Sequence, residues 1–322
     1  MMRKKKPVLL SFHAISNGKT TLIFGQLIFT LYRNFSFTDY SRIETFRRIA
    51  ALYLANRCQK CKVELVFDSA TIEMRTDRNG LFFGKRDFRK TPGYLKEVRI
   101  SGKKEVHIPA NLYSHHVRHL DTHTLVISDI DDTLLHSFIS NKLLKFRTLM
   151  LTRVEKRKTV DNMVRLVNRL HEDGAALFYL SNSEQNLYPL IYRFLRQNDL
   201  PPGPVFLKHF RKMRHVLTGR KLPRKDLHKL EILEEIIQLF PAKKFVLVGD
   251  NTQNDLSIYA QAATDYPKQI SEIIIRRVVE SAHNQSLVDQ VTMDLKGKGI
   301  GLHYAGSFPE DLLHSLTDSY HT

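Results

Sequence analysis

The stretch Thr124-Leu-Val-Ile-Ser-Asp129-Ile-Asp131-Asp-Thr133 joins an apolar run to two carboxylates that stand two residues apart. A run of β-branched and apolar residues is typical of a parallel strand that is buried on both faces. In open α/β sheets, ligands bind just beyond the carboxyl ends of such strands, which is where Asp129 and Asp131 lie. One carboxylate can attack phosphorus while the other protonates the leaving alcohol. The stretch therefore predicts the nucleophile loop of a metal-dependent phosphoryl-transfer enzyme, with an acidic turn after a strand as the alternative.

A second apolar run, Ala176–Leu180, stops at Ser181-Asn182-Ser183. Hydroxyl and amide side chains can hold a phosphate oxygen, and helix-favouring sequence follows at Leu187–Arg196, where the first backbone N–H groups can add anion binding. The same residue types are also common in turns and helix caps. We expect Ser181 and Asn182 to bind phosphate, with an ordinary turn as the alternative.

Two further pieces follow in the chain. Lys229 opens a strongly helical run that ends at Phe240, and a fixed ammonium there would screen an attacking carboxylate from the phosphate. A lone lysine in a basic region is unremarkable, so this assignment depends on the next piece. There, a strand leads into Gly249 and Asp250, and Asp255 follows. Carboxylates at this spacing suit Mg²⁺, a hard cation that takes oxygen ligands.

These pieces, in this order, resemble the haloacid dehalogenase superfamily of phosphatases. The closer resemblance is to the phosphatidate phosphatase catalytic-domain family of the actin-patch-associated type, and it spans roughly residues 120–315. It is carried by Ser-Asp-Ile-Asp-Asp-Thr at 128–133, Tyr-Leu-Ser-Asn-Ser at 179–183, Pro-Pro-Gly-Pro at 201–204, Lys-Leu-Glu at 229–231 and Phe-Val-Leu-Val-Gly-Asp at 245–250, together with Gln253, Asp255, Ile258-Tyr259 and the strand 272–277.

The resemblance implies a role for each matching residue. Asp129 is the expected nucleophile, Asp131 the acid and base, and Lys229 the screening cation. The expected phosphate-binding side chains are Thr133, Ser181 and Asn182. The expected Mg²⁺ ligands are Asp129, Asp131 through its main-chain carbonyl, Asp250, and Asp255 through a bound water or by orienting the loop.

The sequence departs from the family pattern at two places. Glu184-Gln185 stands where the family usually has Pro-Trp, and Asn251-Thr252 stands where it usually has Ser-Gly. Neither change removes a charged catalytic group, so we expect these positions to affect substrate preference rather than activity.

Length and patterning predict two domains. The 322 residues are about twice the usual size of one domain. Residues 1–120 read as a smaller β-rich, sandwich-like domain, with strands such as Thr21–Tyr32, Lys62–Phe67 and Glu97–Ile100 and with Asn17-Gly18, Asp77–Gly80 and Ser101-Gly102 as hairpin turns. A helix over Phe35–Tyr53 is the alternative there.

Residues 121–322 read as an α/β domain, a haloacid-dehalogenase-like (Rossmann-like) parallel sheet with helices on both faces. Helical stretches are expected at Val160–Asp173, Leu187–Asn198, Lys229–Phe240 and Gln253–Ala263. A last strand is expected within Gly299–Gly306 and a last helix at Pro309–Leu316.

Charge is the second informative property, because Lys and Arg number 50 against 33 Asp and Glu, a net charge of +17. This balance favours anionic partners. Lys208–Lys229 holds nine basic residues and one acid, and Lys142–Lys158 holds seven and one. The second segment is interleaved with apolar residues, so it is predicted either to enter a membrane interface or to form a solvated basic helix. No segment approaches the roughly 20 apolar residues of a spanning helix, so any membrane association is expected to be peripheral.

Three other motifs are set aside. Gly18-Lys19-Thr20 lacks the earlier glycine of a phosphate-binding loop, since His13 stands there, and it is predicted to be a hairpin turn. Cys58 and Cys61 form a single C-x-x-C without a second pair, so we predict no zinc or redox role, and two cysteines in all fit a reducing compartment. A histidine cluster at 115–119 is expected to be a polar linker rather than a metal site.

Together these patterns and the family resemblance predict a cytoplasmic, peripherally membrane-associated hydrolase. The expected reaction is Mg²⁺-dependent hydrolysis of phosphatidate to diacylglycerol and phosphate through an aspartyl-phosphate, with anionic phospholipid as the partner. The enzymatic alternative is a polynucleotide 3′-phosphatase or another phosphomonoesterase, with nucleic acid as the anionic partner. The non-enzymatic alternative is a module that binds anionic lipid.

Overall fold

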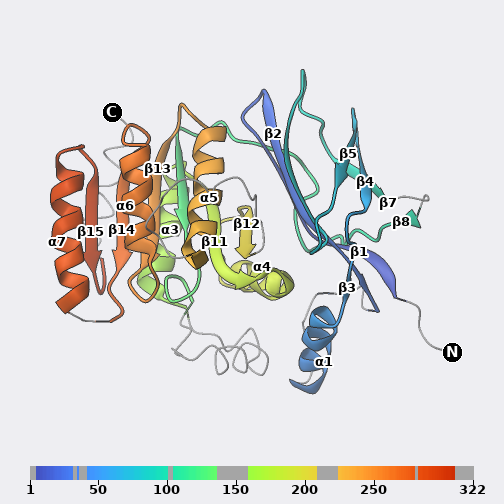
Figure 1. Cartoon of the computed structure of the whole chain (residues 1–322), viewed down its shortest axis with the longest axis horizontal. Helices are drawn as coiled ribbons and strands as arrows, with labels where there is room; N and C mark the ends of the chain where they lie inside the picture. The colour runs from blue at the N-terminus through green and yellow to red at the C-terminus, as the bar shows by residue number, and fades with distance from the viewer. Residues whose placement is uncertain are drawn as a thin grey trace. The chain divides into compact units, whose positions relative to one another are not determined.

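The structure is a computed structural model and describes residues 5–31, 35, 42–100, 104–135, 159–208, 224–279 and 282–308 (Figure 1). The described residues group into two compact units. Unit 1 comprises those up to Asp121 together with Glu184–Gln197, and unit 2 comprises those from Thr122 to Ser183 and from Asn198 onward. The segments Lys142–Lys158 and Pro309–Leu316, and most of Lys208–Lys229, lie outside the described residues.

Unit 2 is built on a six-stranded sheet with the order β12-β11-β10-β13-β14-β15. The neighbours from β11 through to β15 pair in parallel. The central strands are buried along almost their whole length, as expected for parallel strands covered on both faces. The strands are β10 (Thr124–Ser128), β11 (Ala176–Glu184), β12 (Val205–Lys208), β13 (Lys244–Asp250), β14 (Ile270–Arg276) and β15 (Gly301–Ala305).

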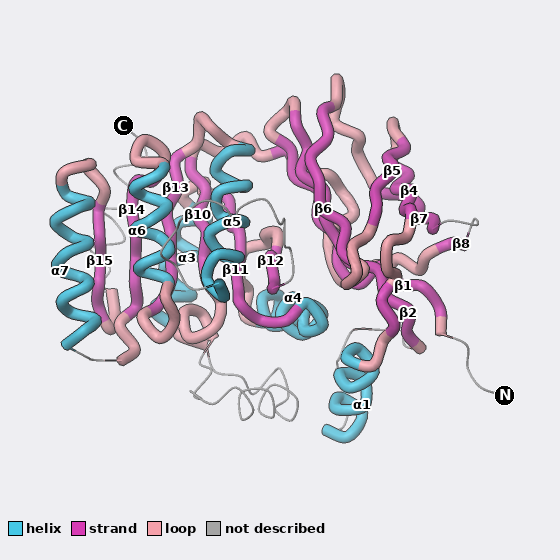
Figure 2. Tube along the Cα trace, viewed as in Figure 1, coloured by secondary structure: helices cyan, strands magenta, loops and turns pink. Residues whose placement is uncertain are grey.

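Helices cover both faces of this sheet. Figure 2 shows α5 (Arg224–Leu239) and α6 (Asp255–Asp265) in front of the strands, α3 (Asp161–Glu172) behind them, and α7 (Ala282–Lys296) at the left beside β15. The chain starts in the central strand β10, moves outward to β12, returns to β13 beside β10, and then moves outward to β15. This is the doubly wound order, in which right-handed crossovers in opposite directions place helices on opposite faces. The predicted α/β class with a parallel sheet is confirmed, and the order places the reversal point between β10 and β13.

The Pro-Pro-Gly-Pro segment at 201–204 is hydrogen-bonded to β11. Tyr179 of β11 donates its backbone N–H to the Pro204 carbonyl at 2.9 Å and its hydroxyl to the Pro201 carbonyl at 2.7 Å. Between these bonds, Gly203 lies so close to β11 that a Cβ there would collide with the Leu177 carbonyl oxygen and lie 2.9 Å from its carbon. The close approach of two backbones explains why glycine stands between prolines at this point.

Unit 1 consists of two sheets. The first has the order β3-β2-β1-β9 with β6 also paired to β2, and the second has the order β5-β4-β7-β8. Phe12 of β1 and Phe67 of β4 stand with ring centroids 6.2 Å apart, so the two sheets share an apolar core. The strands are β1 (Lys6–Ser16), β2 (Thr20–Thr30), β3 (Asn56–Arg57), β4 (Lys62–Phe67), β5 (Thr71–Arg75), β6 (Leu81–Asp87), β7 (Leu95–Ile100), β8 (Lys104–Glu105) and β9 (Arg118–His119).

The turns of unit 1 were predicted with mixed success. Asn17-Gly18 does close the β1–β2 hairpin, with Gly18 at φ 98° and the Asn17 side chain accepting from the N–H groups of Lys19 and Thr20. Asp77–Gly80 does not close a hairpin, because β5 and β6 belong to different sheets and the turn carries the chain between them. Ser101-Gly102 lies outside the described residues, although β7 and β8 pair in antiparallel fashion.

Three further predictions from the sequence can be compared with the structure. Of the stretch Phe35–Tyr53, residues Arg42–Tyr53 form helix α1, so the helical alternative is right for this part. Cys58 and Cys61 are joined in a disulfide where the chain passes from β3 to β4, whereas the sequence predicted an incidental C-x-x-C without a zinc or redox role. Within the described ranges, every helix falls short of the length and apolar character that a bilayer crossing requires.

Helix α4 (Tyr188–Gln197) groups with unit 1, although the alternation of strands and helices predicted a cover for the parallel sheet. The Gln185 amide donates to Ser11 Oγ at 2.7 Å, and the Tyr188 hydroxyl lies 3.1 Å from His13 Nε2. Burial, and then the neighbouring Arg118 cation, lower the pKa of His13 to about 3, so the imidazole is neutral at pH 7. Buried hydrogen-bond partners on β1 thus attach this segment to unit 1. The periodicity of apolar residues in the sequence does not predict such partners.

Gly203→Ala tests the close contact between Gly203 and the backbone of β11. The added methyl collides with the backbone of β11, and overpacking of this kind costs typically about 1–3 kcal/mol. Urea unfolding of the purified chain should show this loss in the transition that reports on unit 2. Gly297→Ala is the matched control, because a Cβ at Gly297 meets nothing within 4 Å, and its stability should stay within about 0.5 kcal/mol of the unsubstituted protein. Equal midpoints for both variants would contradict the close packing of the two segments.

Candidate active site

The loop after β10 turns sharply at the reversal point of the sheet. Asp129 still follows the strand, since its N–H donates to the Val248 carbonyl of β13 at 2.8 Å. Asp132 then adopts φ 61°, a left-handed conformation that aspartate tolerates better than most residues. The N–H groups of Leu134 and Leu135 both donate to the Ile130 carbonyl and close the turn. The loop thus holds two buried carboxylates, Asp129 and Asp131, at the carboxyl end of the central strand.

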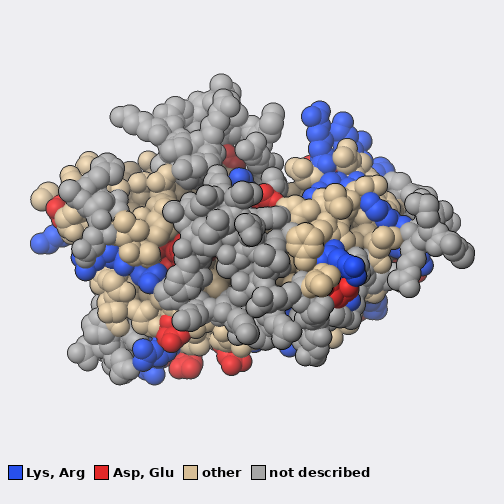
Figure 3. Space-filling view, turned by 90° about the horizontal axis from the view of Figure 1, so that it is seen from below, with Lys and Arg blue, Asp and Glu red and all other residues tan. Residues whose placement is uncertain are grey.

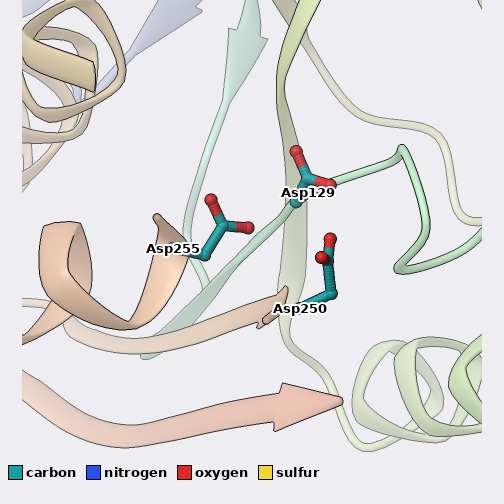
Figure 4. Close-up of side chains that lie close together, drawn as sticks. All are labelled: Asp129, Asp250 and Asp255. Carbon is teal, nitrogen blue, oxygen red and sulfur yellow. The ribbon is translucent and has the colours of Figure 1, made fainter. Parts of the chain in front are cut away.

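Three carboxylates converge at this point from separate elements. Asp129 follows β10, Asp250 ends β13 and Asp255 begins α6, and one carboxylate oxygen of each lies within 4.8 Å of the other two. Figure 4 shows the three side chains turned toward one another. All three are completely buried. Of the four predicted metal ligands, the structure therefore brings together the side chains of Asp129, Asp250 and Asp255.

A buried ammonium lies against this cluster. Lys229 of α5 has no exposed surface and donates to Asp129 Oδ1 at 2.7 Å and to Asp255 Oδ1 at 2.6 Å. The sequence predicted that Lys229 would lie near the nucleophile, and the structure adds Asp255 as its second partner. Two carboxylate partners hold the Lys229 ammonium in one position. A lysine side chain at the surface, in contrast, samples many conformations.

The cluster carries more negative than positive charge. Burial raises the pKa of Asp129 well above its ordinary value against the opposing effect of the Lys229 ammonium. Burial and the Asp255 carboxylate raise the pKa of Asp250 to about 6, in spite of hydrogen bonds from Thr252. Burial alone would lower the pKa of Lys229, but Asp129 and Asp255 outweigh it and raise that pKa well above its ordinary value. One ammonium is therefore too little to balance three carboxylates in a desolvated site.

The donor set fits a hard divalent cation. Asp255 Oδ2 is buried and has no hydrogen-bond partner among the residues that the structure describes. A buried carboxylate oxygen without a donor is costly unless a cation meets it. Carboxylate oxygens are the ligands that Mg²⁺ takes in proteins. The carboxylates of Asp129, Asp250 and Asp255 together could therefore hold a divalent cation such as Mg²⁺.

Gly249 makes this arrangement sterically possible. A Cβ at this position would lie 2.6 Å from Asp255 Oδ2, 2.8 Å from Asp255 Cβ and 2.9 Å from the Tyr259 ring. The sequence suggested that the glycine lets the backbone turn. The structure gives a different reason, because it is the close approach of Asp255 and Tyr259 to the strand that excludes any side chain.

Asp131 lies apart from the carboxylate cluster. Its Oδ2 accepts hydrogen bonds from Ser181 Oγ at 3.0 Å and from Ser183 Oγ at 2.7 Å. Ser181 Oγ in turn accepts the Ser183 N–H at 2.9 Å. The two carboxylates of the loop thus have different surroundings, since an ammonium faces Asp129 and hydroxyl groups face Asp131. If the two carboxylates have distinct chemical roles, their surroundings must differ in this way.

The three side chains predicted to bind phosphate are all in the site and have partners there. Thr133 Oγ1 lies 3.1 Å from Asp250 Oδ2 and 3.3 Å from Asp129 Oδ2, between two members of the carboxylate cluster. Ser181 donates to Asp131, as described above, and the Asn182 amide donates to Gln253 Oε1 at 2.8 Å. In this arrangement these side chains orient the acidic residues and the loops, and their binding of phosphate stays a prediction.

Residues 124–277 match the family model described as "Phosphatidate phosphatase APP1, catalytic domain". That region is therefore similar in sequence to this family. A curated relative, Phosphatidate phosphatase APP1 of Saccharomyces cerevisiae, is 30% identical over 175 residues, which are 52% of this chain and 29% of the relative. The family resemblance seen in the sequence is thereby confirmed, and the match supports the predicted enzyme class, a phosphoric monoester hydrolase.

Two further comparisons add less. An uncharacterized protein of Schizosaccharomyces pombe is 27% identical over 155 residues, which are 48% of this chain and 25% of that protein. This chain thus spans less than a third of the length of either curated relative. Among solved structures, a PilB minor pilin from Streptococcus sanguinis aligns with 10% identity over 92% of its chain and 99% of this one, at a TM-score of 0.29. A score this low has no bearing on fold or function.

The positions that depart from the pattern of the APP1 catalytic-domain family have structural partners of their own. Gln185 supplies the hydrogen bond to Ser11 within unit 1. Asn251 accepts from the N–H groups of Val278 and Val279 at 2.7 and 3.1 Å and donates to the Tyr304 hydroxyl at 2.8 Å, so it holds the chain that leaves β14. Thr252 donates its N–H to Asp250 Oδ1 at 2.6 Å.

Sequence reasoning missed Ser183, Thr252 and Arg276 as contributors to the site. Arg276 ends β14 and donates from Nη1 to the Asp132 carbonyl at 2.7 Å, so a guanidinium holds the left-handed turn between the two loop carboxylates and Thr133. Burial lowers the pKa of Arg276, against the opposing effect of Asp250. The available signal was a charged residue directly after the apolar run Ile273–Ile275, at the edge where the other site residues lie.

Lys229→Met tests the balance of charge in the cluster. Removing one partner from a buried ion pair leaves an uncompensated charge and costs about 3–5 kcal/mol. Urea unfolding at pH 7 in EDTA should show that loss, and added Mg²⁺ should restore part of it because the cation offsets the carboxylates. Lys244→Met, which removes an exposed lysine from the same unit, should change stability by less than about 0.5 kcal/mol. If Lys229→Met lowers the free energy of unfolding no more than this control does, the buried ion pairs of Lys229 with Asp129 and Asp255 would be contradicted.

Proposed function

We propose that residues 121–322 form a Mg²⁺-dependent phosphatase of the haloacid dehalogenase type, which hydrolyses phosphatidate to diacylglycerol and phosphate. The observation that carries the proposal is the convergence of Asp129, Lys229, Asp250 and Asp255 beside the reversal point of a doubly wound sheet. The family match over residues 124–277 supports the same conclusion. The proposed domain boundary near residue 120 agrees with the first change of unit at Asp121, whereas Glu184–Gln197 departs from it.

Asp129 is the proposed nucleophile. A carboxylate can attack phosphorus without first losing a proton, provided that it is ionised. The Lys229 ammonium at 2.7 Å favours the ionised form of Asp129, which burial disfavours. Lys229 also fixes the direction of the Asp129 side chain, because the second bond to Asp255 prevents the ammonium from moving away. The product of the attack is a phosphoryl group bonded to an Asp129 oxygen.

Asp131 is the proposed acid and base. It stands two residues after the nucleophile on the same closed turn, and the hydroxyls of Ser181 and Ser183 hold its Oδ2. From that position it would give a proton to the leaving alcohol in the first step and take a proton from the attacking water in the second. Hydrolysis of the acyl phosphate by that water regenerates the Asp129 carboxylate and releases phosphate.

Asp129, Asp250 and the main-chain carbonyl of Asp131 are the proposed ligands of Mg²⁺, with Asp255 as an indirect ligand. A bound Mg²⁺ would supply Lewis-acid stabilisation of the charge on the transferred phosphoryl group. Thr133 and Thr252 keep the ligand carboxylates oriented. Arg276 supports the turn through the Asp132 carbonyl, so the loop geometry does not depend on the ion alone.

Phosphatidate is the proposed substrate because the named relative from Saccharomyces cerevisiae is a phosphatidate phosphatase. The net charge of +17 suits an anionic lipid surface, and a peripheral, cytoplasmic association is part of the proposal. The test is phosphate release, with Mg²⁺ and with EDTA, from phosphatidate vesicles, a 3′-phosphorylated oligonucleotide and p-nitrophenyl phosphate. Release from phosphatidate that requires Mg²⁺ is expected. Release from the oligonucleotide alone would favour a polynucleotide phosphatase, and no release from any of the three would favour a binding module.

Asp129→Asn should abolish turnover. The amide keeps the shape of the side chain but is not a nucleophile, and it weakens the proposed metal site, so phosphate release should fall on the order of 10³-fold or more. Thermal unfolding should show that the variant is folded. A variant with a tenth of the original rate, or an original rate that EDTA leaves unchanged, would rule out the proposed mechanism.

Asp131→Asn should separate the two chemical steps. With p-nitrophenyl phosphate, whose leaving group needs no proton, the variant should still phosphorylate Asp129 but should hydrolyse the intermediate slowly. Rapid quenching and mass spectrometry should therefore find phosphate on the peptide that contains Asp129. Phosphate bonded to residue 131 in the unsubstituted protein would reverse the two assignments.

A further inference from the structure

Helix α1 carries two apolar faces, of which only one is buried. Thr45, Ile49 and Leu52 point into unit 1 and are at most 6% exposed. Ile43 and Phe46, with Leu54 one turn after Ala50, follow the spacing of a single helix face. Leu54 continues the helical turn, because its N–H donates to the Ala50 carbonyl at 2.9 Å. These three bulky side chains are 66%, 45% and 75% exposed, so they form an unpartnered apolar stripe on the described surface.

The stripe extends onto the end of the first sheet. The antiparallel register pairs Phe29 of β2 with Asn56 of β3, which brings Leu31 and Leu54, each two residues further on, to the same end of the two strands. Leu31 is 48% exposed. The four side chains Leu31, Ile43, Phe46 and Leu54, here called the α1 surface, thus come from two segments that the fold of unit 1 brings together.

Basic side chains border the α1 surface. Lys5 donates from Nζ to the Leu54 carbonyl at 3.2 Å. The exposed Lys6 pairs with Thr30, the neighbour of Leu31, and the exposed Arg47 follows Phe46 on α1. The acidic Glu44 of α1 is paired with Arg48 at 3.0 Å. Figure 3, seen from the side on which Figure 1 draws α1, shows both basic and acidic side chains among uncharged ones on this face. The border of the α1 surface is therefore positively charged.

We propose that the α1 surface docks on an anionic lipid bilayer. Bulky apolar side chains along one helix face can enter the region between headgroups and acyl chains while neighbouring basic groups meet anionic headgroups. The proposal concerns binding by unit 1 and is independent of the chemistry of unit 2. It also differs from the predicted interfacial role of Lys142–Lys158, which lies outside the described residues.

The test is flotation of the full chain with phosphatidylcholine vesicles that contain 0% or about 20% phosphatidylserine, a lipid that the proposed phosphatase does not hydrolyse. The unsubstituted protein should float with the anionic vesicles and not with the neutral ones. Ile43→Ser, Phe46→Ser and Leu54→Ser together should weaken this binding at least tenfold. Met293→Ser is the matched control, because Met293 lies on α7 and is 77% exposed, and it should bind as the unsubstituted protein does.

A second variant separates charge from folding. Lys5→Glu with Arg47→Glu leaves the apolar side chains in place, and it should lose binding to anionic vesicles at least tenfold while its melting temperature stays unchanged. Hydrolysis of p-nitrophenyl phosphate should be the same for all of these variants, so a failure of docking is distinguishable from a failure of the proposed phosphatase. Undiminished flotation of both multiple variants would overturn the proposal. A dimer that the serine variant abolishes, without vesicle binding by the original protein, would identify a second copy as the occupant instead.

Discussion

The ammonium of Lys229, buried between Asp129 and Asp255, is the interaction on which the arrangement of the site depends. It joins the end of β10, the middle of α5 and the first residue of α6, and each of these elements would otherwise bring an uncompensated charge into a desolvated space. The same bond explains why a lysine is tolerated with no exposed surface. The remaining negative charge is carried by Asp250 and by the second oxygen of Asp255, and it is this excess that a divalent cation would offset.

The sheet order determines where this interaction can form. The chain leaves β10 in one direction and continues from β13 in the other, so the loops after these neighbouring strands diverge and leave room between them. Asp129 and Asp250 stand at the ends of these two strands. Gly249 then lets Asp255 approach from α6, and Arg276 at the end of the next strand holds the loop turn at Asp132. With Ser181 and Ser183 of β11, four neighbouring strands thus contribute to one site because their carboxyl ends lie at the same edge.

Unit 1 takes up a segment that follows the active-site loop directly in the chain. The change of unit falls between Ser183, which contacts Asp131, and Glu184. Beyond this point, Gln185 and Tyr188 form buried hydrogen bonds with Ser11 and His13 of β1. The Ser181–Ser183 segment of unit 2 is therefore followed directly in the chain by a segment that packs within unit 1. The exposed stripe on α1 gives the same unit a surface that nothing in its own fold covers.

The sequence by itself determined the elements whose cause is local. The apolar run at Thr124–Ser128, and the similar runs before Ser181 and Gly249, predicted the parallel strands. The abrupt change to Asp, Ser and Gly at the ends of these runs indicated Asp129, Asp131, Ser181 and Asp250 as candidate site residues. Burial on both faces requires such runs, and chemistry at the sheet edge requires polar residues where they stop. Tertiary structure alone decided the partners: that Lys229 bridges to Asp255, that Ser183 holds Asp131, that Arg276 supports the loop, and that helix α4 belongs to unit 1. These contacts join residues from 26 to more than 170 positions apart, and side-chain packing and charge compensation at such separations leave no periodic trace in the chain.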